Sequence, residues 1–101
     1  MAVVKREKKE DGVIECLIDS SNILHSEYDK SKKTLKITFK AGTRYVYKEV
    51  LDRDYIRFEV SESQGSVFNK TMNKYECTKL ISLTEEGLLN LKSQINERKG
   101  V

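Results

Sequence analysis

Basic side chains between positions 30 and 48 are the residues of this 101-residue chain that most clearly indicate a chemistry. No aspartate or glutamate interrupts this segment, which contains Lys30, Lys32, Lys33, Lys36, Lys40, Arg44 and Lys48. Ammonium and guanidinium groups gathered in this way attract phosphates. The alternative interpretation is that lysines on a solvated strand only discourage aggregation.

A second candidate site lies at residues 63–66. Ser63, Gly65 and Ser66 resemble a phosphate-binding turn, because Gly65 and a helix that starts at Ser66 would expose backbone N–H groups. Most sequences of this kind only end one helix and start another. We therefore rank this anion-binding candidate after the basic segment.

No motif in the sequence indicates catalysis. His25 is the only histidine, and no serine or cysteine nucleophile is placed beside it by a recognisable motif. A strand residue with a satisfied hydrogen bond is the expected role of His25. The acidic residues lack the spacing of a metal loop. We expect a non-enzymatic protein with no catalytic residue, no metal site and no cofactor.

The basic segment is positioned by a predicted β-hairpin over residues 34–48, in which apolar and polar residues alternate on both sides of a turn. A three-residue loop, Lys40 to Gly42, puts both Tyr45 and Tyr47 into the core. A two-residue loop shifts the register by one and turns the tyrosines to solvent. We favour the first register, because it places Gly42 where φ > 0 is needed. The two-residue loop would instead place Ala41 at its first position, where alanine is poor. The outer face of the hairpin then holds Thr34, Lys36, Thr38, Arg44 and Lys48.

The rest of the chain predicts a small α+β domain. Met1 to Asp11 has the composition of a mobile arm, Val13 to Ile18 can add an edge strand, and Ile23 to Tyr28 is a strand with poor alternation. Three helices are expected, and each has an apolar stripe. The first begins at Asp52 and has Tyr55 and Phe58 on its stripe, and the second begins at Ser66 and has Phe68, Met72 and Tyr75. The third begins at Thr84 and has Leu88, Leu91 and Ile95, with Leu89 widening the stripe. Cys77 to Ile81 is a short extended segment.

The composition limits the class of protein further. The net charge is +3, apolar residues make up 38 % and charged residues 35 %, which suits one small domain with a strongly solvated surface. No apolar run approaches the ~20 residues of a membrane span, and no hydrophobic signal core follows Met1. Cys16 and Cys77 lack metal-ligand spacing, so we expect both to be reduced and buried, in a cytoplasmic protein.

An ordered set of short motifs adds a family resemblance. The set comprises SSNI (Ser20 to Ile23), YD (Tyr28-Asp29) and LKITFKAGTRYVY (Leu35 to Tyr47), followed by Val50, Tyr55, Phe58, Ser63, Gly65, Phe68, Asn69 and Tyr75. Together these resemble the KTSC domain, a short module found at the C-terminus of some lysyl-tRNA synthetases and alone in small bacterial and bacteriophage proteins. Ser26 and Ser61 depart from the family, which usually has an apolar residue at the first position and alanine at the second.

The resemblance implies a three-stranded antiparallel meander followed by two short helices, and it suggests contact with RNA by association with the synthetase. It divides the chain into an N-terminal extension (1–19), a KTSC-like domain (20–81) and a C-terminal amphipathic helix (82–101). Because Asn69 belongs to the family set, it joins the anion-binding candidate at residues 63–66.

The sequence thus predicts a small binding module that holds RNA or another polyanion. The expected nucleic-acid contacts are Lys30, Lys32, Lys33, Lys36, Arg44 and Lys48. The alternative is a phage-type oligomeric regulator that captures a host protein or a small anionic nucleotide at residues 63–69. We also expect a homodimer through Leu88, Leu91 and Ile95, because this apolar stripe must be covered. The other way to cover it is to fold back onto the chain's own sheet.

Overall fold

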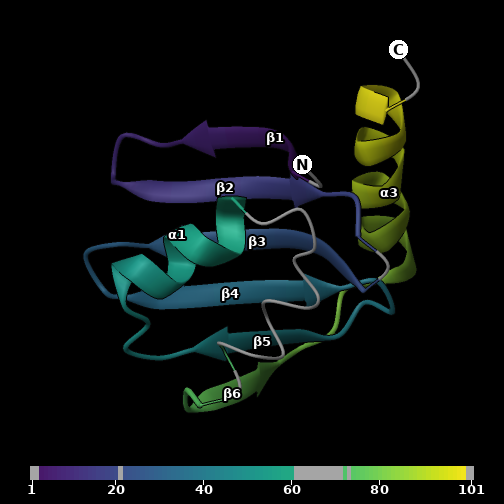
Figure 1. Ribbon diagram of the computed structural model, residues 1–101. Coiled ribbons are helices and arrows are strands. Elements are labelled where there is room, and N and C mark those ends of the chain that lie inside the picture. Colours follow the sequence, from purple (N-terminus) through teal and green to yellow (C-terminus); the bar gives the residue numbers. More distant parts are fainter. Residues whose placement is uncertain (1–2, 21, 61–71, 73, 100–101) are drawn as a thin grey trace.

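The computed structural model describes residues 3–20, 22–60, 72 and 74–99, which contain a six-stranded antiparallel sheet (Figure 1). The strands lie side by side in sequence order: β1 (Val3–Lys8), β2 (Val13–Ile18), β3 (Ile23–Asp29), β4 (Thr34–Phe39), β5 (Arg44–Tyr47) and β6 (Cys77–Leu80). The described helices are α1 (Asp52–Val60) and α3 (Glu85–Lys99). The predicted α+β class is confirmed, but the predicted three-stranded meander is only the β3–β5 part of a larger sheet.

The β4–β5 hairpin has the favoured register. Ile37 lies opposite Tyr45 and Leu35 opposite Tyr47. The loop closes with hydrogen bonds from the Phe39 amide to the Thr43 carbonyl at 2.8 Å and from the Gly42 amide to the Phe39 carbonyl at 2.9 Å, and Gly42 has φ +94°. Tyr47 is buried and Tyr45 is partly buried, so both rings belong to the core side of the sheet.

Gly42→Ala should lower the free energy of unfolding by about 1 kcal/mol, because the alanine backbone must then adopt a left-handed conformation. Space is not the problem, since an added Cβ would meet Leu88 Cδ2 only at 3.7 Å. Gly87→Ala is the matched control: this glycine lies in α3 without a positive φ, so alanine should leave stability unchanged or raise it by up to about 1 kcal/mol. Urea unfolding of both variants makes the comparison, and equal stability of Gly42→Ala and the wild type would contradict the assignment.

The N-terminal segment is a strand, so the predicted mobile arm is wrong. β1 pairs with β2 from Val3 opposite Ile18 to Lys8 opposite Ile14, with a register shift between Val3 and Lys5. The Asp11-Gly12 turn connects the two strands, with Gly12 at φ +87°. The backbone hydrogen bonds of a strand do not depend on side-chain charge, and the charged side chains of β1 still reach solvent. β1 also displaces β2 from the predicted edge position, because β1 itself is the edge strand.

A register shift explains the poor alternation of the β3 sequence. The pairing of β3 with β4 is irregular between Ile23 and His25. Regular alternation would put Leu24, and not Ile23, on the face of Tyr28. The irregularity instead places Ile23 in the same apolar cluster as Tyr28 and Leu24 in a second cluster, and both residues are buried.

The main core lies between α1 and one face of the sheet (Figure 1). We term this face of the sheet the α1 face. Tyr28 of β3 and Tyr55 of α1 stack with ring centroids 4.2 Å apart and planes inclined by 7°. Phe58 lies beside Tyr55 and is 1 % exposed, which confirms the predicted stripe. The helix begins at Asp52 as expected. Its first amides, those of Asp54 and Tyr55, donate to the Leu51 carbonyl, while the Asp52 carboxylate accepts from the Tyr28 hydroxyl.

The last helix packs on the opposite face of the sheet, at one end of β1–β3. Thr84 caps it as predicted, since its hydroxyl oxygen accepts from the Gly87 amide at 3.1 Å. The stripe of Leu88, Leu91 and Ile95 packs against Val4, Leu17 and Leu24. The stripe is therefore covered within the chain, and the physical reason for a dimer through these residues is removed.

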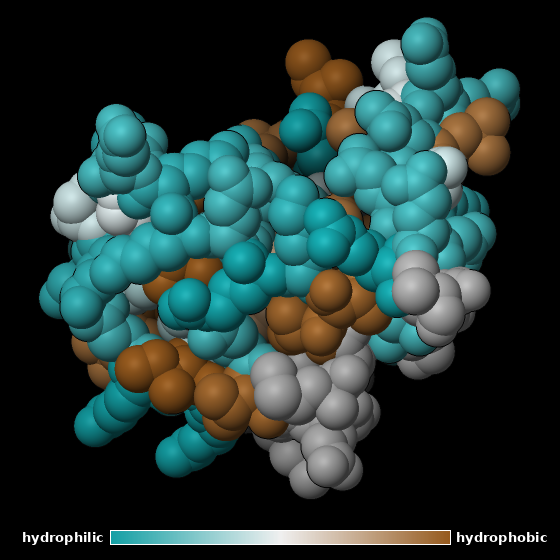
Figure 2. Space-filling model, turned by 90° about the horizontal axis from the view of Figure 1, so that it is seen from above, coloured by the Kyte–Doolittle hydropathy of each residue, from teal (hydrophilic) through white to brown (hydrophobic). Residues whose placement is uncertain are grey.

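Other apolar side chains remain exposed. Leu89 was expected to widen the α3 stripe, but it is 66 % exposed. Seen from the β1 side, hydrophobic residues appear in several separate groups among hydrophilic ones (Figure 2). No helix in the described ranges is both long enough and apolar enough to span a membrane.

The predicted helix from Ser66 falls mostly on residues that the structure does not describe. Of its expected stripe, Met72 is buried in the main core and Tyr75 packs against that core. The predicted extended segment after it is confirmed as β6, which pairs with β5.

Candidate functional site

The sheet face opposite α1, here termed the open face, carries two of the predicted basic contacts. Lys36 Nζ lies 3.6 Å from Glu27 Oε2 on the neighbouring strand, and Arg44 Nε donates to the Ile81 carbonyl at 2.8 Å. Both cations are thus engaged within the chain. Because acidic side chains share this face, it does not form the continuous basic surface that the sequence predicts.

The remaining predicted lysines gather at one end of the sheet. The β3–β4 turn contains Lys30, Lys32 and Lys33, and we term residues 30–33 the lysine turn. All three lysines are exposed, and so is Lys48, which follows β5 at the same end. Lys30 Nζ lies 3.7 Å from Asp52 Oδ2, whereas the other three make no ion pair within the described part of the chain.

Local hydrogen bonds hold the lysine turn in one shape. Asp29 Oδ1 accepts from the Ser31 hydroxyl at 2.7 Å and from the Ser31 and Lys32 amides at 3.0 and 3.2 Å. These hydrogen bonds lower the pKa of Asp29. Lys33 adopts φ 55°, and its carbonyl accepts from the Val50 amide at 2.8 Å. A turn fixed in this way presents its ammonium groups from a defined backbone.

A hollow of about 290 Å³ lies on the α1 face beside the lysine turn, and we term it the α1 hollow. Its cationic lining residues are Arg6, Lys8 and Lys30, and its acidic ones are Asp52 and Glu59. Lys8 is exposed at the end of β1. Sequence reasoning missed Arg6 and Lys8, because their segment was interpreted as a mobile arm. The available signal for a strand was the pair Val3-Val4 ahead of the charged run.

Glu59 forms a polar network at one side of this hollow. Its Oε1 accepts from Arg6 Nε at 2.7 Å and from the Tyr55 hydroxyl at 2.9 Å, and the Cys16 thiol lies 3.6 Å away. Burial is the main cause that raises the pKa of Cys16 to about 11. A raised pKa favours the protonated thiol, which is the less nucleophilic form of cysteine.

The two cysteines differ. Cys16 is buried as predicted, but Cys77 is exposed, because it lies on β6 at the open edge of the sheet. Both thiols are free.

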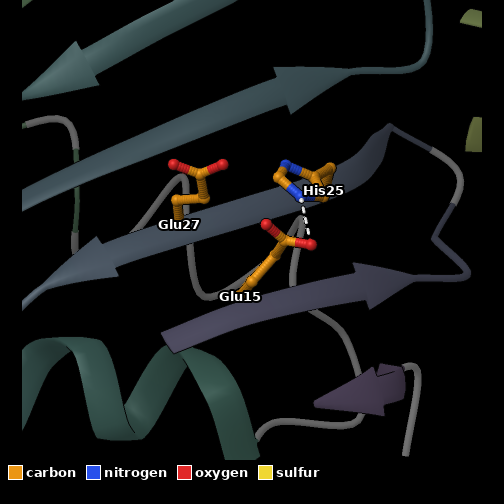
Figure 3. A group of neighbouring side chains, drawn as sticks. All are labelled: Glu15, His25 and Glu27. Carbon is orange, nitrogen blue, oxygen red and sulfur yellow. Dashed lines mark ion pairs between the residues drawn. The ribbon is translucent and has the colours of Figure 1, made fainter. Parts of the chain in front are cut away.

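The open face contains a second polar group, formed by Glu15 of β2 with His25 and Glu27 of β3 (Figure 3). His25 Nε2 lies 3.6 Å from Glu15 Oε1, which is beyond the length of the ordinary hydrogen bond that was expected for this histidine. Burial lowers the pKa of His25, although both glutamates act in the other direction. No sequence spacing reveals this group, because it depends on the register that places Glu15 opposite Glu27.

The second sequence-based candidate falls outside the described residues, since Ser63, Gly65, Ser66 and Asn69 all lie in 61–71. The structure thus brings together the lysines of the β3–β4 turn and Lys48, and adds Arg6 and Lys8. Lys36 borders the same hollow as Lys32 but is paired with Glu27, and Arg44 is bound to the Ile81 carbonyl.

Comparison with known proteins identifies relatives of the central part of the chain. A family model described as the KTSC domain matches residues 19–75. The crystal structure of a KTSC domain protein from Yersinia pestis is similar, with a TM-score of 0.63 and 27 % sequence identity, over 76 % of this chain and 97 % of that chain. None of the curated proteins matches the chain.

Proposed function

The chain belongs to the KTSC domain family, and we propose that it is a non-enzymatic module that binds RNA through the end of the sheet that carries the lysine turn. The observation that supports this most is the group of exposed cations without ion pairs within the described residues: Lys8, Lys32, Lys33 and Lys48. Phosphate groups of a flexible single strand can follow such a group without base-specific contacts.

The proposed contacts differ from those expected from the sequence. Lys36 would have to leave Glu27, and Arg44 would have to leave the Ile81 carbonyl, before either could bind a phosphate. Lys30 keeps a role, because its contact with Asp52 at 3.7 Å joins two exposed side chains, and such contacts are weak. Lys8 extends the surface from the lysine turn to the α1 hollow, whereas Arg6, another cation of that hollow, is held by Glu59 at 2.7 Å.

The binding should depend steeply on salt. With about four phosphate contacts to a single strand, the association constant falls with a log–log slope near −3, or roughly fifty-fold between 50 and 200 mM salt. Fluorescence anisotropy with a labelled oligouridine RNA measures this slope. The absence of binding at the lowest salt concentration would contradict the proposal.

A pair of charge-matched variants locates the surface. The triple variant Lys32→Glu, Lys33→Glu, Lys48→Glu should lose RNA binding and keep its circular dichroism spectrum. The control, Lys40→Glu, Lys79→Glu, Lys92→Glu, makes the same change in net charge elsewhere and should bind nearly as the wild type does. Equal losses in the two variants would show that net charge alone, and not this end of the sheet, attracts the RNA.

The alternative ligand, a small anionic nucleotide, has one structural feature in its favour. The α1 hollow is close to the smallest volumes that hold small ligands, and three cations line it. A mononucleotide that binds there should displace the labelled RNA, and Lys8→Glu should weaken both ligands. This site differs from the one expected at residues 63–69.

A further inference from the structure

Two carboxylates and one imidazole converge on the open face of the sheet. The candidate ligand atoms of Glu15, His25 and Glu27 all lie within 4.8 Å of one another (Figure 3). Glu15 and Glu27 are directly opposite each other on β2 and β3, and His25 precedes Glu27 by two residues and so shares its face.

The register places these acids in an unfavourable arrangement. Glu7 of β1 is directly opposite Glu15, so three carboxylates form one row across three strands. Like charges directly opposite each other destabilise a sheet. A row of this kind needs cations near it.

Lysines supply part of that compensation from the sides of the row. Lys9 Nζ lies 3.1 Å from Glu15 Oε2, and Lys36 Nζ lies 3.6 Å from Glu27 Oε2. The other oxygen of Glu15, Oε1, faces His25 Nε2 instead. A neutral imidazole offers a lone pair on one ring nitrogen and an ionised carboxylate offers lone pairs on its oxygens, so the two groups can share a cation.

We propose that Glu15, His25 and Glu27 bind a divalent transition-metal ion, with Zn²⁺ as the best match. One imidazole nitrogen and two carboxylate oxygens form a ligand set that zinc accepts, and three protein ligands leave a position for water. Calcium and magnesium prefer more oxygen ligands than these side chains offer. Tetrahedral zinc needs ligand atoms about 3.3 Å apart, so the groups must draw together by roughly 1 Å, which glutamate side chains can do by rotation.

The site is partly enclosed. The His25 side chain is 12 % exposed and the side chains of Glu15 and Glu27 are 29 % and 32 % exposed, so the imidazole is fixed by packing while the carboxylates can adjust. Lys9 and Lys36 compete with the metal for the carboxylates. This competition gives the site a specific signature, because removal of either lysine should strengthen metal binding.

Cobalt is the probe, since Co²⁺ in a tetrahedral site absorbs visible light. The full chain is used with Cys77→Ser, because the exposed Cys77 thiol could bind metal by itself. We expect stoichiometric tetrahedral bands that Zn²⁺ displaces. In the same background, His25→Gln, Glu15→Gln and Glu27→Gln should each weaken binding by at least about tenfold.

Two further variants separate this site from general negative charge. Glu7→Gln removes the third carboxylate of the row without removing a ligand and should leave Co²⁺ affinity within about threefold of the parent, whereas Lys36→Met should tighten it by roughly threefold or more. Absence of tetrahedral bands, or equal losses in Glu7→Gln and Glu15→Gln, would overturn the proposal. RNA binding is measured separately and does not depend on the outcome.

Discussion

Phe58→Ala should lower the free energy of unfolding by about 3–5 kcal/mol, because it leaves a cavity between α1 and the sheet. Phe58 is 1 % exposed and lies beside Tyr55, whose ring stacks on Tyr28 of β3. The free energy of unfolding of a domain is typically about 5–15 kcal/mol, so this loss is a large part of the stability. Urea unfolding followed by tyrosine fluorescence measures it.

Ile56→Ala is the matched control for this prediction. Ile56 belongs to the same helix but is 55 % exposed, so its truncation removes little buried surface and should cost less than about 1 kcal/mol. Similar losses in the two variants would mean that α1 does not pack on the sheet through Phe58.

Asp54→Ala should cost about 2–4 kcal/mol at pH 7, because it removes the acceptor of charge-assisted hydrogen bonds. The Asp54 carboxylate accepts from the Tyr75 hydroxyl, and Lys74 Nζ lies 3.1 Å away. The Asp54 side chain is 5 % exposed, whereas Lys74 remains largely in solvent. These contacts fasten the start of α1 to the segment that leads into β6.

The loss of stability caused by Asp54→Ala should also depend on pH. The hydrogen bond from Tyr75 is the main cause that lowers the pKa of Asp54, and Lys74 adds to it. Since the folded pKa lies below the ordinary value, the stabilisation is complete above about pH 4 and is lost as the pH falls through the folded pKa. The difference between wild type and Asp54→Ala should therefore shrink below pH 4.

Tyr75→Phe gives an independent measure of the same contact. It removes the hydroxyl and keeps the ring, so it should reproduce part of the Asp54→Ala loss with the same decrease at low pH. A loss that stays constant from pH 7 to pH 3 would show that the carboxylate does not act through its charge.

The sequence was most informative where one residue decides the geometry. Gly42 and Ala41 set the hairpin register, because the three-residue loop places the glycine at a positive φ and keeps alanine out of the first position of a two-residue loop. Thr84 set the start of α3 in the same way, and the spacing of Tyr55 and Phe58 set the buried stripe of α1. Each of these features depends on neighbours within a few positions of the chain.

Features that join distant segments could not be predicted in this way. The contact of Arg6 with Glu59 needs β1 to exist and to lie beside α1, and a charge-rich segment gives little sign of a strand. The meeting of Glu15 with His25 and Glu27 needs the β2–β3 register. The α3 stripe was visible, but nothing local says whether a helix covers its own sheet or a second copy.

The sequence order of the strands has a consequence for how the chain reaches this fold. The pairings from β1 to β5 each join neighbours in sequence through short turns, so each can form with little loss of loop-closure entropy. The pairing of Tyr47 with Cys77 is different, because α1 and the segment after it must be enclosed before β6 can add to the sheet. The short sequence separation of the first four strand pairings favours rapid folding, and we expect the β5–β6 closure to be the late step. Opening of β6 can then occur while the first five strands remain paired.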